Sequence, residues 1–253
     1  MSRIIAIINQ KGGSGKTTTA VNLGAYLARL DKSVLLIDLD PQANSTIHFG
    51  FKSHEIQRSV YDVMMDEKLF SNIIQHTDVD NLFIAPANIN LSGVEIELAG
   101  MVGREMILKD AIEKIANMYN YILIDSPPSL GLLTVNALTA TKEIVIPVQT
   151  EFFALEGMGK LFHTVDIVKK RLNRDLKVTG IVPTMFDGRT NLSREVMEKI
   201  REYFGERVYK TIIRKNIKLA EASSHGKPIL LYDPRSAGAE DYENLSREVD
   251  NRV

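Results

Sequence analysis

A short glycine-rich segment, Lys11–Thr17, is the feature that most constrains how this chain can fold. It reads Lys-Gly-Gly-Ser-Gly-Lys-Thr and lies between an apolar run, Ile4–Ile8, and a helix-compatible stretch, Thr18–Leu30. A strand, a glycine loop and a helix in that order form the phosphate cradle of a nucleoside triphosphate site. The pattern G-x-x-x-x-G-K-[ST] is not met, because Gln10 stands where its first glycine should be. In its place the loop carries an additional lysine, Lys11, ahead of the usual one.

The residue types of this loop suit phosphate binding. Glycines adopt backbone angles that other residues avoid, and they let main-chain amides and a helix N-terminus approach phosphate oxygens. Lys16 is placed to reach the β- and γ-phosphates, and the Thr17 hydroxyl is placed to complete a Mg²⁺ shell. The competing interpretation is a glycine-rich turn with solvated lysines. We expect these residues to contact a nucleotide: Gly12, Gly13, Ser14, Gly15, Lys16, Thr17 and Thr18.

Short apolar runs alternate with helical patterns along the rest of the chain. Strand-length runs occur at Ile4–Ile8, Val34–Ile37, Leu82–Ala85, Tyr121–Ile124, Glu143–Val148 and Val178–Val182, with a weaker one at Val208–Ile213. Helical patterns cover Arg104–Met118, Ala154–Leu172 and Ala239–Val249, and the stretch Gly50–Asp80 is the least regular. Near-continuous apolar runs indicate strands buried on both faces, as in a parallel sheet. The alternation predicts an α/β fold with a doubly wound, mainly parallel sheet flanked by helices.

Bulk composition narrows the class of protein. The chain has 253 residues, which suits a single domain over 1–253, and it has no cysteine to ligate zinc or an iron–sulfur cluster. Because an apolar run begins within the first few residues, we expect no signal peptide and no N-terminal DNA-binding extension. No apolar stretch approaches the roughly 20 residues of a membrane span. The net charge of −1 means that any contact with nucleic acid must come from a local basic face.

Two carboxylates follow the predicted second strand, in the run Asp38-Leu39-Asp40-Pro41-Gln42. Open α/β sheets bind ligands at the carboxyl ends of their strands. Asp40 is a candidate to orient or deprotonate an attacking water near the γ-phosphate, and Asp38 is a candidate to order the Mg²⁺ shell. The alternative is that one or both only cap the turn before Pro41, since aspartate before proline is a common turn signal.

A third aspartate closes another buried run, in Tyr121-Ile-Leu-Ile-Asp125-Ser126-Pro127-Pro128. An aspartate at the end of an apolar strand is the Walker-B arrangement, which holds Mg²⁺ directly or through water. The two prolines after it make a rigid loop that could sense the γ-phosphate. A purely structural turn is the alternative.

Together these segments resemble the deviant Walker A type of P-loop NTPase, and within that group the ParA/Soj partition ATPases of the MinD/ParA superfamily. The resemblance extends over nearly the whole chain. Further segments that carry it are Pro147–Gln149, Phe152–Gly157, Thr184-Met185, Asp187–Thr190 and Gly226–Pro228.

The resemblance implies an ATPase that works as an ATP-sandwich homodimer. In that family the extra lysine reaches the partner's nucleotide, which would be the role of Lys11, while Gly12 would lie at the tightly packed interface. Lys16 would hold phosphates within its own subunit, Asp40 would serve the attacking water, and Thr17, Asp125 and Asp38 would serve Mg²⁺. Met185 would lie beside the nucleotide. A cation added across a symmetric interface stabilises the charge of the transferring phosphoryl group.

The resemblance also implies partners. The ATP-bound dimer would bind double-stranded DNA without sequence preference, and a ParB/Spo0J-like adaptor would stimulate hydrolysis. The expected location is cytoplasmic and nucleoid-associated. Candidate DNA contacts are Arg189, Lys215 and Lys218, with Arg214 and Lys227 as further candidates. A solvated charged face is the alternative for each of these residues.

Other readings stay open at this point. A MinD-like membrane ATPase needs a basic amphipathic C-terminal helix, but the chain end offers only Tyr242, Leu245, Val249 and Val253 in an acidic context, and these are better used in packing. We therefore expect no stable membrane association. A ParA-like protein that positions a protein cargo and a scaffold that binds ATP without turnover are further alternatives. Ser14, Arg214 and Ser223 depart from the family's common residues, and Arg214 brings the shape of the adenine pocket into question.

Overall fold

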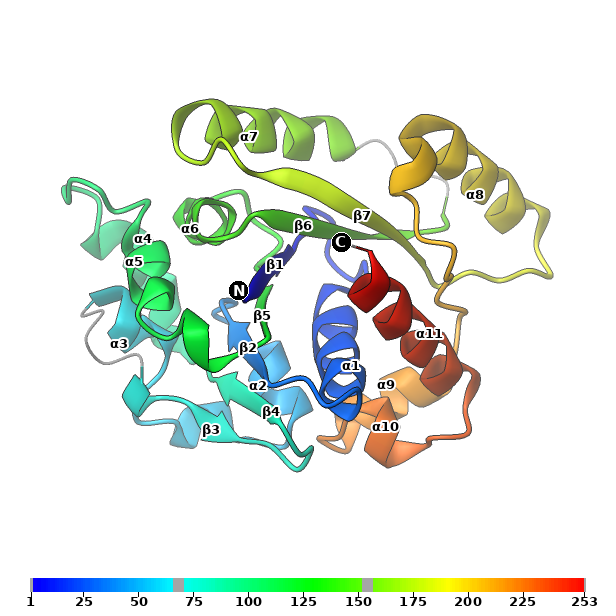
Figure 1. Cartoon of the computed structure of the whole chain (residues 1–253), viewed down its shortest axis with the longest axis horizontal. Coiled ribbons are helices and arrows are strands. Elements are labelled where there is room, and N and C mark those ends of the chain that lie inside the picture. Colours follow the sequence, from blue (N-terminus) through cyan, green and yellow to red (C-terminus); the bar gives the residue numbers. More distant parts are fainter. Residues whose placement is uncertain (1, 66–70, 152–156, 253) are drawn as a thin grey trace.

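A seven-stranded, mainly parallel sheet forms the centre of the computed structural model, which describes residues 2–65, 71–151 and 157–252. The strand order is β3-β4-β2-β5-β1-β6-β7, and only the pairing of β3 with β4 is antiparallel (Figure 1). The bounds are β1 Arg3–Ile7, β2 Val34–Asp38, β3 Gln75–His76, β4 Leu82–Ala85, β5 Tyr121–Asp125, β6 Glu143–Gln149 and β7 Lys177–Thr184.

Helices cover both faces of this sheet. Their bounds are α1 Lys16–Arg29, α2 Asn44–His48, α3 Val60–Met65, α4 Val94–Glu97, α5 Ile107–Glu113, α6 Leu132–Ala140, α7 Met158–Arg171, α8 Asn191–Phe204, α9 Ile217–Ser224, α10 Ile229–Tyr232 and α11 Ala237–Asn251. Short 3₁₀ segments lie at Ser53–Glu55, Ile89–Gly93, Ala116–Met118 and Gly205–Arg207.

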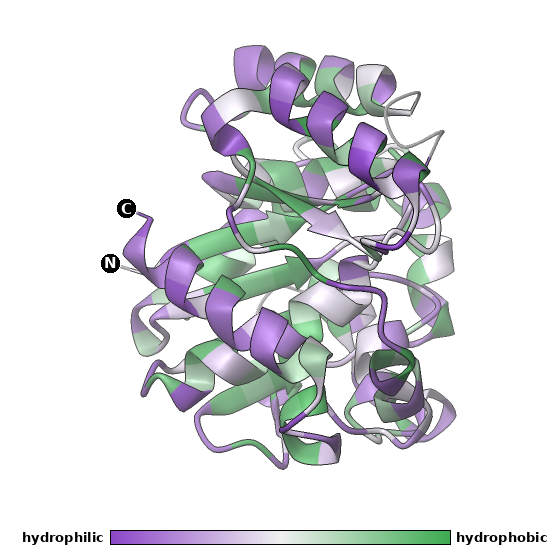
Figure 2. Ribbon diagram, turned by 90° about the vertical axis from the view of Figure 1, so that its right-hand side faces the viewer, coloured by the Kyte–Doolittle hydropathy of each residue, from purple (hydrophilic) through white to green (hydrophobic). Residues whose placement is uncertain are grey.

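Alternating strand residues divide the apolar side chains into two cores. Ile5 and Ile7 pack with α1 and α11, whereas Ala6 and Ile8 pack on the opposite side with α5, α6, α7 and α8. Because successive side chains of a strand point to opposite faces, a strand covered on both sides must be apolar throughout. The sheet is accordingly the most hydrophobic part of the molecule, and polar residues colour the outer helix faces (Figure 2). The predicted α/β, doubly wound architecture is confirmed.

The C-terminal helix α11 lies beside α1, and its apolar face is used in packing (Figure 1). Tyr242, Leu245 and Val249 are almost completely buried, as expected, although they pack on α1 as well as on the sheet. Val253 lies outside the described residues. None of the described helices combines the length and the hydropathy needed to cross a bilayer.

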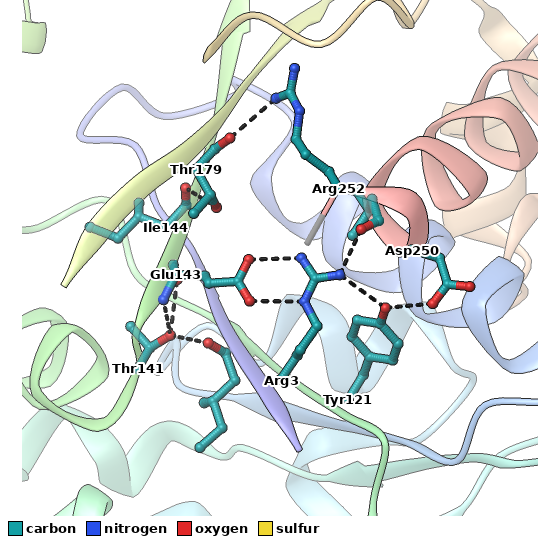
Figure 3. Close-up of polar contacts among 10 residues, drawn as sticks. Arg3, Tyr121, Thr141, Glu143, Ile144, Thr179, Asp250 and Arg252 are labelled. Atoms are coloured by element: carbon teal, nitrogen blue, oxygen red, sulfur yellow. Dashed lines mark hydrogen bonds and ion pairs between the residues drawn. The ribbon is translucent and has the colours of Figure 1, made fainter. Parts of the chain in front are cut away.

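A polar network fastens the end of α11 to the amino ends of the strands (Figure 3). The Arg3 guanidinium donates two hydrogen bonds of 2.8 Å to the Glu143 carboxylate and one of 3.1 Å to the Tyr121 hydroxyl. It also donates to the main-chain oxygen of Val249, and Tyr121 in turn donates to Asp250. Residues from β1, β5, β6 and α11 are thereby joined at the amino ends of the strands, on the side of the sheet opposite the glycine loop.

Six of the predicted strands are confirmed, but the weaker prediction at Val208–Ile213 is wrong. Val208 forms an isolated bridge with Ile181, and the amides of Tyr209 and Ile213 each donate to a β7 carbonyl at 2.9 Å, but these contacts do not continue into a ladder. The amides of Lys210 and Thr211 instead donate to the carboxylate of Glu248 on α11, at 2.8 and 2.9 Å. A tertiary acceptor therefore takes the hydrogen bonds that a ladder would need.

The predicted helices are confirmed with shifted bounds. The stretch Arg104–Met118 is divided into α5 and a 3₁₀ turn. Its helix begins only at Ile107, where Asn136 of α6 accepts from the amide of Leu108 and donates to the carbonyl of Arg104. In the irregular stretch Gly50–Asp80 the described residues form short elements only. The start of the predicted helix Ala154–Leu172, with most of the segment Phe152–Gly157, lies outside the described residues, and α7 accounts for the remainder.

Candidate functional site

The glycine loop emerges from the carboxyl end of β1 and leads directly into α1. Gly13 and Gly15 have positive φ angles of 71° and 89°, a region that favours glycine. A Cβ on Gly15 would also meet the Thr184 side chain at 3.6 Å. Gly12 differs from the other two, since its φ lies outside the left-handed region and a Cβ there would meet nothing within 4 Å. Within one chain, backbone geometry explains two of the three glycines.

Asp125 brings two hydroxyl groups together at the end of β5. Its Oδ2 atom accepts hydrogen bonds of 2.8 Å from Thr17 at the start of α1 and from Ser45 on α2. Its other oxygen, Oδ1, is buried and has no hydrogen-bond partner among the described residues. A buried carboxylate oxygen without a donor, beside a threonine hydroxyl, fits hydrated Mg²⁺, which prefers oxygen ligands and retains several waters.

Asp38 occupies the matching position on the neighbouring strand and is paired in register with Asp125. It is completely buried, and its Oδ2 atom accepts from both the amide and the hydroxyl of Thr46, at 2.8 and 2.7 Å. Its Oδ1 atom accepts from the amide of Asp40 at 3.2 Å. These contacts make Asp38 an anchor for the loop that follows β2, so its role as a magnesium residue stays a prediction.

Burial raises the pKa of both carboxyl groups. Desolvation, with repulsion from Asp125 second, raises the pKa of Asp38 to about 8. Desolvation also raises the pKa of Asp125 to about 6, against the hydrogen bonds from Thr17 and Ser45. Two adjacent carboxylates removed from water disfavour a second negative charge. The pair is therefore suited to a cation that would restore its ionised form.

Asp40 both shapes its loop and faces the cavity beside the glycine loop. Its Oδ1 atom accepts from the amide of Gln42 at 2.9 Å, so the turn-capping alternative is part of its function. It also lines the cavity together with Lys16 and Thr17. No described residue donates a hydrogen bond to its Oδ2 atom, which is available to a water molecule.

The two lysines of the loop lie in different surroundings. Lys16 is only 8% exposed, lines the cavity and donates to the main-chain oxygen of Lys11 at 3.3 Å. Burial lowers the pKa of Lys16, while Asp125 and Asp40 act in the opposite direction. The Lys11 side chain is 39% exposed, does not line the cavity, and lies 3.4 Å from the Glu151 carboxylate.

Two adjoining cavities extend from the loop. The first, about 520 Å³, contains the glycine loop, Asp40, Pro128 and Met185. The second, about 480 Å³, shares Gly15, Thr18, Met185 and Ser223 with it and has apolar walls that include Ile213, Leu219 and Tyr242. A polar cavity next to an apolar one has the character of a nucleotide site, with room for phosphates in one and a base in the other.

Met185 is a strained residue at the boundary of the two cavities. Its φ angle of 55° lies in the left-handed region, which is uncommon for a residue with a side chain. Gln149 donates to the Met185 sulfur at 3.2 Å. The structure thus places Met185 next to the expected nucleotide, although its contact with nucleotide stays a prediction.

Several residues that support the loop received no role in the sequence analysis: Gln149 and Thr184 were named only within segments that carry the resemblance, and Ser45 and Thr46 were not named. Gln149 donates to the carbonyl of Gly13 at 2.7 Å, and Thr184 donates to the carbonyl of Ser14 at 2.9 Å. Both close neighbouring strands at the same edge of the sheet. Ser45 and Thr46, which hold Asp125 and Asp38, follow Asp40 closely in the chain. Two features of the sequence could have identified these residues. Ser45 and Thr46 are hydroxyl residues shortly after a strand-ending aspartate, and Gln149 and Thr184 are polar residues that end other strands.

The candidate DNA-contacting cations divide into paired and unpaired residues. Arg189 binds Asp187 at 2.7 Å, and Lys218 binds Glu221 at 2.8 Å. Arg214 lines the second cavity and binds Asp241 and Glu240 on α11, both at 2.6 Å, so its charge is matched within the chain. Lys215 and Lys227 are exposed and have no ion pair with a described residue.

Comparisons with known proteins agree with this geometry. The family described as an AAA domain matches residues 2–178. The sporulation initiation inhibitor protein Soj of Bacillus subtilis is 54% identical over 249 residues and covers 98% of both chains. The chromosome-partitioning ATPase Soj of Treponema pallidum is 47% identical, covering 98% of this chain and 97% of its own. The chain belongs to the ParA/MinD family of P-loop ATPases.

Solved structures extend the similarity to ligands. Cobyrinic acid a,c-diamide synthase from Mycobacterium smegmatis, with bound ADP and magnesium, superimposes with a TM-score of 0.87 and 35% identity, covering 98% of this chain and 93% of its own. MinD from Pyrococcus horikoshii, complexed with Mg-ADP, has a TM-score of 0.80 and 25% identity, covering 99% and 97%. As a member of this family the chain is an ATPase, with ATP and Mg²⁺ as its cofactors.

The raised pKa values of the buried carboxyl pair predict an acid-favoured stability. The ordinary carboxyl pKa is 3.8, so the folded protein retains protons that the unfolded chain has released. The resulting stabilisation is complete below that value and is lost as the pH rises through the folded pKa values of about 6 and about 8. We expect the free energy of unfolding of the protein without nucleotide or Mg²⁺ to fall from about pH 5 to about pH 8.

Urea unfolding over that pH range measures this effect. Asp38→Asn removes one titrating group and should flatten the profile, whereas the exposed Asp78→Asn should leave it unchanged. Parallel profiles for wild type and Asp38→Asn would contradict the prediction.

Proposed function

We propose that the chain is an ATP-dependent partition switch. Two copies enclose ATP, the resulting homodimer binds double-stranded DNA without sequence preference, and hydrolysis stimulated by a ParB/Spo0J-like adaptor releases it. The relatives from Bacillus subtilis and Treponema pallidum, the second of which is named as a chromosome-partitioning ATPase, support this proposal. A cytoplasmic, nucleoid-associated location follows from it.

The position of Lys11 is the main observation that supports an ATP-bound dimer. A lysine of a phosphate-binding loop is expected inside the phosphate cavity, but this side chain lies outside its own cavity and beside Glu151 at the surface. Gly12, next to it, has open space where a side chain would be. A second subunit would use both features: it would accept the Lys11 ammonium near its phosphates and occupy the space over Gly12. The neighbouring subunit would then complete the site.

Different residues of the site are assigned to the phosphates, the metal ion and the attacking water. Lys16 and the loop amides would hold the phosphates, and Thr17 and Asp125 would hold Mg²⁺, which would supply positive charge to the phosphates. Asp40, with a free carboxylate oxygen facing the cavity, orients the attacking water. Ser45 and Thr46 connect Asp125 and Asp38 with α2. Loss of the γ-phosphate would therefore change the position of α2 and of the loop before it.

DNA binding is assigned to the surface around α9. Lys215 and Lys227 are exposed cations with no ion pair to a described residue, so they are available to phosphates without breaking an ion pair. Arg189 and Lys218 would first have to exchange an intramolecular carboxylate for a phosphate. A dimer doubles this surface, which raises the affinity of contacts made only to the DNA backbone.

A ParA-like protein that positions a protein cargo is the second candidate. It shares every feature of the nucleotide site and differs only in what the adaptor connects. The MinD-like alternative receives less support, since the apolar face of α11 is buried against α1.

The dimer proposal predicts that Lys11→Ala retains nucleotide binding but loses ATP-induced dimerisation. The reason is that the Lys11 side chain lies outside its own cavity and would act across the interface. Light scattering with ATP and nucleotide titration measure the two properties separately. Gly12→Val should also lose the dimer, because a Cβ on Gly12 meets nothing within 4 Å in the monomer. Its nucleotide binding is titrated in parallel, since Gly12 also lines the first cavity. A complete dimer of either variant with ATP would refute the proposal.

The role of Asp40 predicts that Asp40→Ala slows steady-state hydrolysis at least about 100-fold while nucleotide binding persists, as expected when a group that positions the nucleophile is removed. The substitution should also trap the ATP-bound dimer. Gln42→Ala is a matched control, since Gln42 lines the same cavity and uses its amide for the turn. Unimpaired turnover by Asp40→Ala would exclude this assignment.

The DNA proposal predicts that Lys215→Glu with Lys227→Glu weakens duplex binding by the ATP-bound dimer at least about tenfold. It should also lower the slope of log affinity against log salt by about 3 to 4, for four lost phosphate contacts per dimer. Fluorescence anisotropy with a duplex of random sequence measures both. Lys160→Glu with Lys199→Glu makes the same charge change elsewhere and should have little effect. Equal binding by ADP-bound and ATP-bound protein at this surface would count against the proposal.

A further inference from the structure

A second basic surface lies where α7 ends and β7 begins. The segment 169–177 contains five cations and one carboxylate, and we call the cations Lys169, Lys170, Arg171, Arg174 and Lys177 the α7–β7 corner. All five are exposed, and none has an ion pair with a described residue. This contrasts with Arg189, Arg214 and Lys218, whose charges are matched by carboxylates. This group of unmatched positive charge lies away from α9 (Figure 1).

A cleft of about 620 Å³ adjoins this corner and adds fixed cations to it. Arg3, Lys142, Lys177 and Arg252 line it, together with Glu143 and Asp175. Arg3 is held by Glu143, and Arg252 donates to main-chain carbonyls, including that of Thr179 at 3.1 Å (Figure 3), and lies 3.8 Å from the Glu248 carboxylate. Lys142 lies 3.7 Å from Asp175 in an exposed ion pair. Positive charge therefore exceeds negative charge both in the cleft and on its rim.

The chemistry of the corner favours the phosphates of a nucleic acid over a lipid surface. Several solvated cations without carboxylate partners bind successive phosphates and release the counterions that condense on them. Insertion into a membrane interface would need exposed apolar side chains beside the cations. Within the segment Leu176 is buried and Leu172 is half-buried, and Ile167 of α7, two residues before the segment, is 43% exposed. One exposed apolar side chain is too little for insertion.

The corner is remote from the nucleotide. It lies at the amino end of β7, and the glycine loop contacts the carboxyl end of the same strand through Thr184. An eight-residue strand separates them by roughly 23 Å at about 3.3 Å per residue. Its exposed side chains need no partner subunit to form the surface. Neither ATP nor a dimer is required to present it.

From this placement we infer that the α7–β7 corner is a second surface for duplex DNA that works in the monomer and does not depend on nucleotide. The inference goes beyond the proposed function, which needs ATP and two subunits. A subunit released after hydrolysis would keep a weak, salt-sensitive hold on DNA through the corner, and the dimer would add the surface around α9.

Anisotropy titration of nucleotide-free protein with a duplex of random sequence tests the inference. Wild type should bind, and its affinity should fall about 40-fold between about 50 and 200 mM salt if three phosphates are contacted. The variant Lys170→Glu, Arg174→Glu, Lys177→Glu should lose at least about tenfold in affinity at the lower salt concentration. The control Arg58→Glu, Lys160→Glu, Lys199→Glu makes the same charge change at exposed sites elsewhere and should stay within about threefold of wild type.

Light scattering separates this inference from the proposed function. The corner variant should still dimerise with ATP, which also shows that it is folded, and the variant Lys215→Glu, Lys227→Glu should keep the nucleotide-free binding. Absence of salt-sensitive binding by nucleotide-free wild type would overturn the inference, as would equal losses in the corner and control variants. Binding of nucleotide-free protein to phosphatidylglycerol vesicles in place of DNA would also overturn it.

Discussion

Two buried carboxylates at the ends of adjacent strands hold the site together. Asp38 and Asp125 are paired in register on β2 and β5, with no solvent to share their charge. Hydroxyl groups compensate for part of this cost: Thr17 and Ser45 donate to Asp125, and Thr46 donates to Asp38. Since these donors come from the start of α1 and from α2, the pair fixes the glycine loop and the Asp40 loop relative to each other. A buried charge costs least when several donors satisfy it.

The same pair gives the site its dependence on cofactors. Burial raises the pKa of both carboxyl groups and so disfavours their ionised forms, and a nearby divalent cation would favour those forms again. The orphaned Oδ1 atom of Asp125 is the matching structural feature. Lys11 lies outside its own cavity, so its charge would be used by a partner subunit, as the charges of the carboxyl pair would be used by the cation.

The distribution of positive charge on the surface divides into two classes. Cations near α9 are partly matched by carboxylates of the same chain, such as Asp187, Glu221 and Asp241. Cations at the α7–β7 corner have no such partners among the described residues. An exposed ion pair contributes little to stability, but it sets a local cost for any phosphate that would replace the carboxylate. The two surfaces therefore suit contacts of different kinds, one conditional on assembly and one always present.

The sequence alone determined the elements and the chemical character of the site. Near-continuous apolar runs of strand length indicate strands buried on both faces. The glycine loop with Asp40 and Asp125 can be recognised because phosphate and Mg²⁺ demand those residue types at strand ends. The tertiary structure decided which polar groups meet. Glu248 takes the amides that Val208–Ile213 would have used in a strand, and Gln149 and Thr184 hold the carbonyls of Gly13 and Ser14. It also decided which lysines and arginines are neutralised. Those outcomes depend on contacts between segments far apart in the chain, and local residue patterns carry no record of such contacts.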